Sequence, residues 1–157
     1  MVIGIDPGKS GGLASVADDG RLVHVAKMPE TDQDLLDLLE EWGENGTLKV
    51  HAYLERVNAG VFGQMGKKGK MGVSSAFTFG GGYRALQMAL TARRIPFDLV
   101  SPQTWQKAMQ CRSGGDKNVT KRRAQQLFPS VKVTHHIADS LLIAEYGRRL
   151  AHDTPAF

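Results

Sequence analysis

The sequence has little cysteine and no long run of apolar residues. One of its 157 residues is a cysteine, Cys111, so the chain cannot form an internal disulfide, and this thiol cannot make a zinc site alone. No stretch reaches the roughly 18 consecutive apolar residues of a membrane-spanning helix. The first residues lack the basic start, apolar run and cleavage site of a secretory signal. We therefore expect a cytoplasmic protein with no membrane partner.

Acidic residues are missing from one long segment. No Asp or Glu occurs from Arg56 to Phe97. Residues 1–55 hold 4 Lys or Arg against 11 Asp or Glu, a balance of −7, whereas residues 56–157 hold 16 against 5, a balance of +11. A basic region of this kind is typical of a surface that binds the phosphate backbone of nucleic acid. An ordinary solvated surface is the alternative.

The length and the hydrophobic pattern predict one α/β domain over residues 1–157 with a mixed sheet. Short apolar runs predict strands at 2–6, 11–17, 21–28, 49–55 and 96–100. Helical periodicity and capping residues predict helices between Thr31 and Gly43, at 75–94, from 102, at 117–128 and at 135–150. A helix separates the third strand from the fourth, which therefore should lie parallel to the first.

Two of the predicted strands end on a carboxylate. Asp6 ends the first strand and Glu55 ends the fourth, and the carboxyl ends of parallel strands meet at one edge of a sheet. The stretch THHIADS adds His136 and Asp139, three residues apart at the start of the last helix. Hard oxygen ligands of this kind suit magnesium or manganese. Two such ions about 4 Å apart are a known arrangement for phosphodiester hydrolysis.

Each of these residues also has a simpler interpretation. Asp6 precedes Pro-Gly and fits a turn residue, and Glu55 fits an ion pair with Arg56. Asp139 fits a carboxylate that stabilises a helix start, and His136 fits a surface or core histidine. The site hypothesis depends on the residues occurring together.

Four blocks of the sequence carry a resemblance to a known family. They are IGIDPG at the start, YLERV on the fourth strand, SPQTWQKAM after the fifth, and HHIADSLLIA on the last helix. In this order and spacing the chain resembles the RuvC family of Holliday-junction resolvases, within the ribonuclease H-like nucleases. The four catalytic positions of that family fall on Asp6, Glu55, His136 and Asp139. Since His135 is adjacent, the sequence leaves open which imidazole faces the metal.

The resemblance implies a five-stranded mixed sheet flanked by helices, a homodimer that pairs partly through helix 75–94, and two Mg²⁺ ions that Mn²⁺ can replace. It implies symmetric cleavage of four-way DNA junctions in a bacterial cell or a phage-infected host. Lys117 corresponds to a catalytic lysine, and Phe62 to an aromatic wedge at the junction centre, although a core or interface role for Phe62 is as reasonable. The expected DNA-binding residues are Phe62, Lys67, Lys68, Lys70, Lys107, Arg112, Lys117, Lys121 and Arg122.

Three other functions are open to a chain of this pattern. Sugar kinases and actin-like ATPases also begin with an Asp-x-Gly turn, but they need two such domains. Another ribonuclease H-like nuclease, acting on RNA–DNA hybrids or on ribosomal RNA, is an alternative. A protein that binds junctions without cutting them is the third, although carboxylates oppose phosphate binding. The sequence identifies neither a cleavage-site preference nor a branch-migration motor as a partner.

Overall fold

The computed structural model describes residues 1–43, 49–57 and 72–153. The elements follow the order β1 (Val2–Asp6), β2 (Gly12–Val16), β3 (Leu22–Lys27), α1 (Asp32–Gly43), β4 (His51–Glu55), α2 (Val73–Ala92), β5 (Phe97–Val100), α3 (Pro102–Ala108), α4 (Lys117–Leu127) and α5 (His135–Asp153). Within these ranges, no helix combines the length and the apolar composition needed to cross a membrane.

The strands form one mixed sheet in the order β3-β2-β1-β4-β5. β1, β2 and β3 are antiparallel neighbours, because short turns join them. β1, β4 and β5 are parallel neighbours, and Ile5 lies opposite Leu54. The next residue on each strand is a carboxylate, so Asp6 and Glu55 end at the same edge of the sheet. The predicted α/β fold, a five-stranded mixed sheet flanked by helices, is confirmed.

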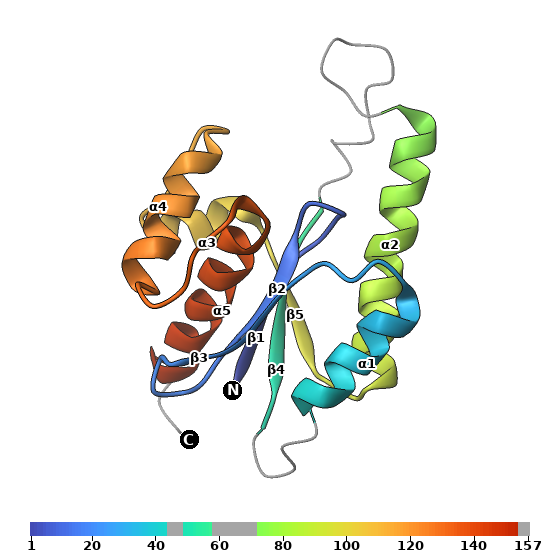
Figure 1. The fold of residues 1–157 in the computed structure, drawn as a ribbon, viewed down its shortest axis with the longest axis horizontal. Coiled ribbons are helices and arrows are strands. Elements are labelled where there is room, and N and C mark those ends of the chain that lie inside the picture. Colours follow the sequence, from blue (N-terminus) through green and yellow to red (C-terminus); the bar gives the residue numbers. More distant parts are fainter. Residues whose placement is uncertain (44–48, 58–71, 154–157) are drawn as a thin grey trace.

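Helices cover both faces of the sheet (Figure 1). α5 lies on one face together with α3 and α4, which we call the α5 face; its core includes Trp105, Leu141 and Leu142. α1 and α2 lie on the other, the α2 face, whose core includes Trp42 and Leu90.

Contact between α5 and β1 is close, because a Cβ atom at Gly4 would collide with the backbone of Ser140 and Ala144. Ser140 follows Asp139 directly in the chain. The first half of α5 is therefore held against β1, the strand that ends on Asp6.

Two helices extend beyond the predicted ends. α2 begins at Val73 and continues through Gly80–Gly82, because Leu86 and Leu90 on the same helix are buried in the core of the α2 face. α5 continues to Asp153, past the predicted end at Leu150. Arg148 and Arg149 pair with Glu145 at one-turn spacing, which stabilises the last turns of α5.

Candidate active site

Asp6 lies at the end of β1, where a tight turn leads into β2. The turn requires glycine, since Gly8 has a positive φ of 99° and a Cβ atom at Gly11 would collide with the Asp6 carbonyl oxygen. Burial raises the pKa of Asp6 well above its usual value, and the charges of Asp139 and Glu55 raise it further. Lys117 acts in the opposite direction. The Asp6 side chain is therefore a carboxylate whose charge its surroundings do not fully compensate.

Glu55 ends β4 and is held by a tryptophan. The Nε1–H group of Trp105 donates a hydrogen bond of 2.7 Å to Oε2 of Glu55. Burial raises the pKa of Glu55 to about 7, although this hydrogen bond lowers it, and the charge of Asp139 adds to the rise.

Asp139 lies in the second turn of α5. Burial raises its pKa, against the effect of a hydrogen bond from the Thr120 side chain and of the charges of Lys117 and His135. Its Oδ1 atom is buried and has no hydrogen-bond partner among the described residues. A buried carboxylate oxygen without a partner is costly, which indicates a position that a cation or a proton completes.

Lys117 is the first residue of α4. The helix start is fixed by Asp116, whose side chain accepts a hydrogen bond of 2.9 Å from the backbone N–H of Asn118. From this position the Lys117 charge lowers the pKa of both Asp6 and Asp139. The structure thus brings the predicted lysine to two of the predicted carboxylates.

The three carboxylates fit a hard divalent cation by their chemistry. Each has a raised pKa, each interacts electrostatically with at least one other, and Asp139 has an oxygen without a partner. Among the residues that the structure describes, no three His, Cys, Asp or Glu side chains lie close enough together to hold a metal ion between them. Mg²⁺ usually keeps several water ligands and is bound through one or two carboxylates, which two of these side chains could supply.

The two adjacent histidines take different positions. The Nδ1 atom of His136 lies 2.9 Å from the carbonyl oxygen of Ser10. A carbonyl can only accept, so Nδ1 donates, and in the neutral imidazole Nε2 keeps the lone pair that a metal ligand needs. His135 acts electrostatically on Asp139.

The neighbouring histidine, His135, also lies on the side of α5 that faces Asp139. A step of one residue from His136 turns His135 by about 100° around the helix. This step does not remove it from Asp139, because His135 and Asp139 are four residues apart, the spacing of neighbours on one helix face.

Solved structures with the same fold exist, although no protein-family model and no curated protein matches this chain by sequence. RuvC of Thermus thermophilus in complex with a Holliday junction substrate is 20% identical with a TM-score of 0.63, and the match covers 98% of this chain and 96% of that chain. A second Thermus thermophilus RuvC structure is 19% identical with a TM-score of 0.61, over 96% of each chain. The chain has the RuvC fold.

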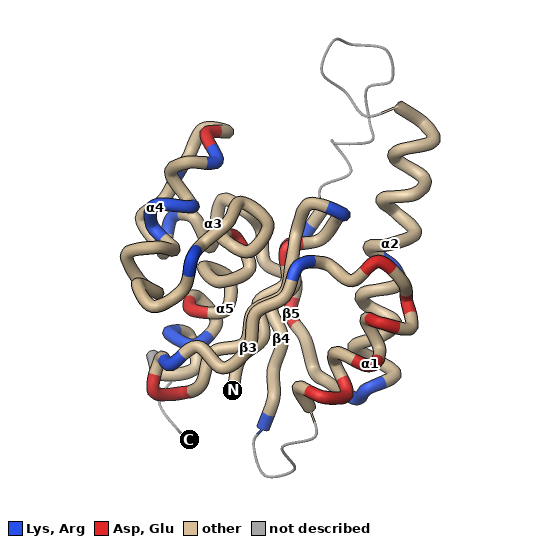
Figure 2. Tube along the Cα trace, in the orientation of Figure 1, with Lys and Arg blue, Asp and Glu red and all other residues tan. Residues whose placement is uncertain are grey.

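Of the basic residues predicted to bind DNA, the five that the structure describes lie on the same side of this RuvC fold as α5. Figure 2 shows positive charge along α4 and negative charge along α1. Lys107 near the end of α3, Arg112 in the segment before α4, and Arg122 on α4 are exposed, and Lys121 is half-buried. Arg123 has a structural role, because its guanidinium donates a hydrogen bond of 2.9 Å to the Met109 carbonyl oxygen and so connects α4 to the end of α3.

Four predicted DNA-binding residues lie outside the described residues: Phe62, Lys67, Lys68 and Lys70. Two further residues form hydrogen bonds with the site carboxylates and were not predicted from the sequence, namely Trp105 and Thr120. Trp105 stands in the SPQTWQKAM block, but its contact with Glu55 depends on how α3 is placed against β4. Thr120 lies one helical turn after Lys117, a spacing that would have indicated a shared face.

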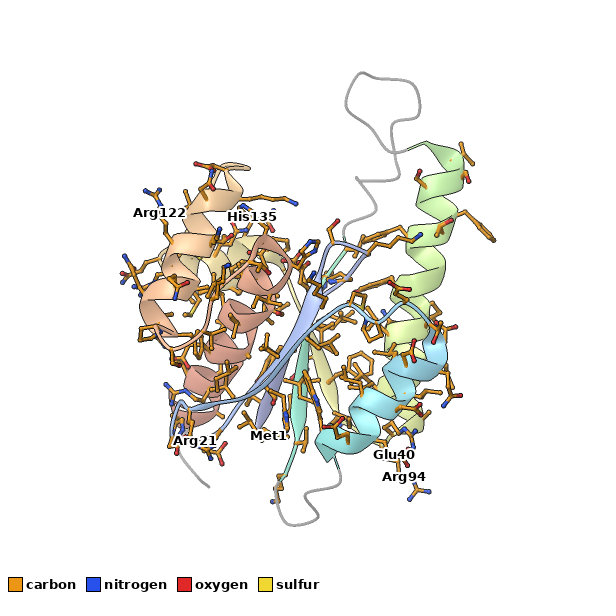
Figure 3. The ribbon with its side chains drawn as sticks, in the orientation of Figure 1. Met1, Arg21, Glu40, Arg94, Arg122 and His135 are labelled. Atoms are coloured by element: carbon orange, nitrogen blue, oxygen red, sulfur yellow. The ribbon has the colours of Figure 1, made fainter. Side chains whose placement is uncertain are left out.

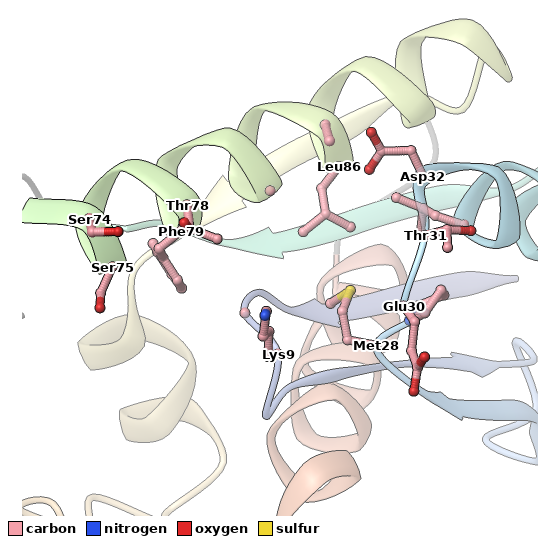
Figure 4. Close-up of a pocket in the computed structure, with 15 residues that line it drawn as sticks. Lys9, Met28, Glu30, Thr31, Asp32, Ser74, Ser75, Thr78, Phe79 and Leu86 are labelled. Atoms are coloured by element: carbon pink, nitrogen blue, oxygen red, sulfur yellow. The ribbon is translucent and has the colours of Figure 1, made fainter.

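A pocket of about 460 Å³ lies beside the turn that follows Asp6, between α2 and the start of α1. In Figure 4, Ser75, Phe79 and Leu86 come from α2, and Lys9 and Met28 come from the strand side. None of the three site carboxylates lines it. Glu30 and Asp32 lie on its wall and oppose an anionic ligand, so we assign this pocket no part in the chemistry.

Proposed function

We propose that this chain is a structure-selective endonuclease that resolves four-way DNA junctions by symmetric, metal-dependent hydrolysis of phosphodiester bonds. The observation that carries the proposal is the group Asp6, Glu55 and Asp139, three carboxylates with raised pKa values at one edge of a RuvC-fold sheet. A similar fold is known in complex with a Holliday junction substrate, which supports the choice of DNA substrate.

In this proposal the carboxylates hold two Mg²⁺ ions, which Mn²⁺ can replace, and His136 adds a nitrogen ligand. When bound, such ions lower the pKa of the attacking water and stabilise negative charge at the scissile phosphate. Lys117 contributes positive charge beside Asp6 and Asp139, where it can stabilise the charge that develops on the phosphate.

The same proposal assigns the DNA backbone to the basic residues around α4. These bind phosphates and set the position of the scissile bond, whereas the acids perform the chemistry. The set is Lys107, Arg112, Lys117, Lys121 and Arg122, together with Lys67, Lys68 and Lys70, and with Phe62 as the wedge at the junction centre. If about six phosphates are neutralised, log affinity falls with log salt concentration at a slope near −5.

A homodimer completes the proposal, because symmetric cleavage needs two sites on one junction. α2 presents apolar side chains to solvent: Phe77 is 84% exposed, Val73 67% and Met88 54%. Exposed large apolar residues on one helix are typical of an interface with another chain. We therefore assign α2 to the contact between the two subunits.

The test compares a synthetic four-way junction, a linear duplex and an RNA–DNA hybrid, each with and without Mg²⁺. We expect symmetric nicks in the junction alone, cleavage with Mg²⁺ or Mn²⁺, and binding without cleavage in Ca²⁺, which prefers more ligands at longer distances. Cleavage of the hybrid alone would identify another ribonuclease H-like nuclease. Equal cleavage in EDTA would exclude the metal mechanism.

A protein that binds junctions without cutting them fits the site less well. Phosphate binding needs cations, and three half-buried carboxylates beside a DNA-binding surface oppose it by charge repulsion. A tight junction complex that leaves every strand intact in Mg²⁺ and in Mn²⁺ would favour this alternative.

A further inference from the structure

Trp105 connects a core helix directly to one of the site carboxylates. Its side chain is fully buried in the core of the α5 face, and only its Nε1–H group is directed to a charged partner, Oε2 of Glu55 at 2.7 Å. The distance is short for an N–H to oxygen hydrogen bond, as expected when the acceptor is a carboxylate.

The start of α3 determines where this indole lies. Glu55 is paired with Val100 on the neighbouring strand, and the backbone N–H of the next residue, Arg56, donates to the Val100 carbonyl oxygen at 2.7 Å. α3 begins directly after β5, since Ser101 caps it by accepting a hydrogen bond of 3.2 Å from the Thr104 N–H. The residue after Thr104 is Trp105, so the cap and the strand register together place the indole beside Glu55.

We propose that Trp105 is a positioning residue of the metal centre, which fixes the Glu55 carboxylate through Oε2 and leaves Oε1 to bind the ion. This inference rests on the proposed metal-dependent function. The indole N–H is a neutral donor and never an acceptor. It therefore orients the carboxylate without neutralising its charge, which a lysine or arginine in the same place would do. Residues that orient metal ligands in this way change metal affinity by about 10- to 100-fold when they are replaced.

The chain contains a matched control for this proposal. Trp42, the second tryptophan, is also buried, but it lies in the core of the α2 face. Its ring stacks on His24, with ring centroids 5.2 Å apart. Replacing either tryptophan by phenylalanine removes the same atoms from a buried position, so loss of packing is similar in the two variants, and only one of them loses a hydrogen bond to a site carboxylate.

The experiment measures Mn²⁺ binding to the full chain without DNA, by the electron paramagnetic resonance signal of free Mn²⁺, for wild type, Trp105→Phe and Trp42→Phe. Thermal unfolding of each variant is followed by circular dichroism. We expect Trp105→Phe to bind Mn²⁺ about 10- to 100-fold more weakly, and Trp42→Phe to bind as wild type does. In junction cleavage, the Mn²⁺ concentration that gives half the maximal rate should rise for Trp105→Phe, and saturating Mn²⁺ should restore much of that rate.

Each outcome decides between a positioning and a packing role. Wild-type Mn²⁺ affinity in folded Trp105→Phe would overturn the inference while leaving the proposed nuclease intact. A wild-type chain that neither binds Mn²⁺ nor cuts junctions would overturn both. Should Trp105→Phe not fold, the Trp42→Phe chain serves as the test, because Trp105 is then its single tryptophan. Mn²⁺ bound at Glu55 should quench the fluorescence of Trp105, and half-maximal quenching should occur at the Mn²⁺ concentration of half-maximal binding. Bound Mn²⁺ that leaves this fluorescence unchanged would also overturn the inference.

Discussion

The two faces of the sheet use the same kind of residue for different purposes. Each face contains one buried tryptophan, yet Trp42 on the α2 face contacts apolar side chains and the His24 ring, whereas Trp105 on the α5 face donates to Glu55. The α5 face also contributes Thr120, which hydrogen-bonds to Asp139. One face therefore stabilises the sheet, and the other stabilises the sheet and also orients the carboxylates at its edge.

The helices on the two faces of the sheet also differ in charge. α1 on the α2 face carries five acidic residues and no basic one, and α4 on the α5 face carries four basic residues and no acidic one. A DNA backbone is attracted to the second and repelled by the first. We therefore predict that DNA reaches the sheet edge from the α4 side, and that changes to the exposed acids of α1 leave DNA cleavage unaltered.

The largest effect should follow from removing one site carboxylate. Asp6→Asn and Asp139→Asn keep the shape of the side chain and remove a charge that the ions need. Several kcal/mol of charge stabilisation correspond to a fall in nicking rate of about 1000-fold or more. Junction binding in Ca²⁺, measured by gel shift, should stay the same or tighten slightly, because repulsion of phosphate falls.

Asp37→Asn is the matched control, since Asp37 is an exposed carboxylate of α1 on the other face. It should nick junctions at the wild-type rate. Nicking by Asp6→Asn at the wild-type rate, with contaminating nuclease excluded, would show that Asp6 is only a turn residue. Asp6 would then differ in no functional respect from the exposed acids of α1.

Much of this arrangement could be predicted from the sequence. Alternating apolar residues and turn signals predicted all five strands, and a carboxylate after two parallel strands predicted that Asp6 and Glu55 meet. The contact of Trp105 with Glu55 could not be predicted, because it depends on the angle between α3 and β4 and not on any spacing within one element. The interaction of His135 with Asp139, in contrast, follows from their spacing of four residues, which places neighbours on one helix face.

The next effect concerns the basic surface around α4. Replacing Lys121 and Arg122 together by glutamine should weaken junction binding about 10-fold or more at physiological salt, and the slope of log affinity against log salt should become less negative by about 2. The position of the nicks should not change. The control is Arg21→Gln with Arg94→Gln, two exposed arginines at the opposite end of the sheet from Arg122 (Figure 3). If the slope of log affinity against log salt changes equally in the control pair, DNA phosphates contact basic residues over the whole surface and not mainly those around α4.

A smaller effect is expected in the stability of the metal-free protein. Burial raises the pKa of Glu55 from 4.5 to about 7. The folded state therefore binds more protons than the unfolded state between these values, and stability must fall as pH rises from about 4.5 to about 7. At 1.36 kcal/mol per pKa unit the part of the loss that Glu55 contributes is about 3 kcal/mol, or roughly 10 °C in unfolding temperature for a chain of this length, and the raised pKa values of Asp6 and Asp139 add to it. Thermal unfolding in EDTA at pH 5 and pH 8 measures it, and Glu55→Gln should make the dependence smaller.

Glu145 provides the contrast for this prediction. It is a buried carboxylate of α5, but although burial alone would raise its pKa, hydrogen bonds from Arg148 and Arg149 lower it below the usual value. Its stabilising effect is therefore lost only when the pH falls below about 4.5. Glu145→Gln should lower the unfolding temperature at both pH values and leave their difference unchanged. A pH dependence that Glu55→Gln does not reduce would show that Glu55 is not the group responsible.

The smallest effects should separate the two histidines at the start of α5. His136→Asp should cut junctions within a few-fold of the wild-type rate, because aspartate supplies an oxygen ligand from the same position, and His136→Ala should need more Mg²⁺ for half its maximal rate. His135→Ala removes only a charge that acts on Asp139, so its rate should fall by a few-fold at most. His24→Ala, on the α2 face, is the control and should change neither the rate nor the Mg²⁺ requirement. All four variants are compared by nicking of one junction over a range of Mg²⁺ concentrations. A raised Mg²⁺ requirement in His135→Ala with a normal one in His136→Ala would assign the metal ligand to His135, and the hydrogen bond between His136 and the Ser10 carbonyl would then only hold α5 to the turn after β1.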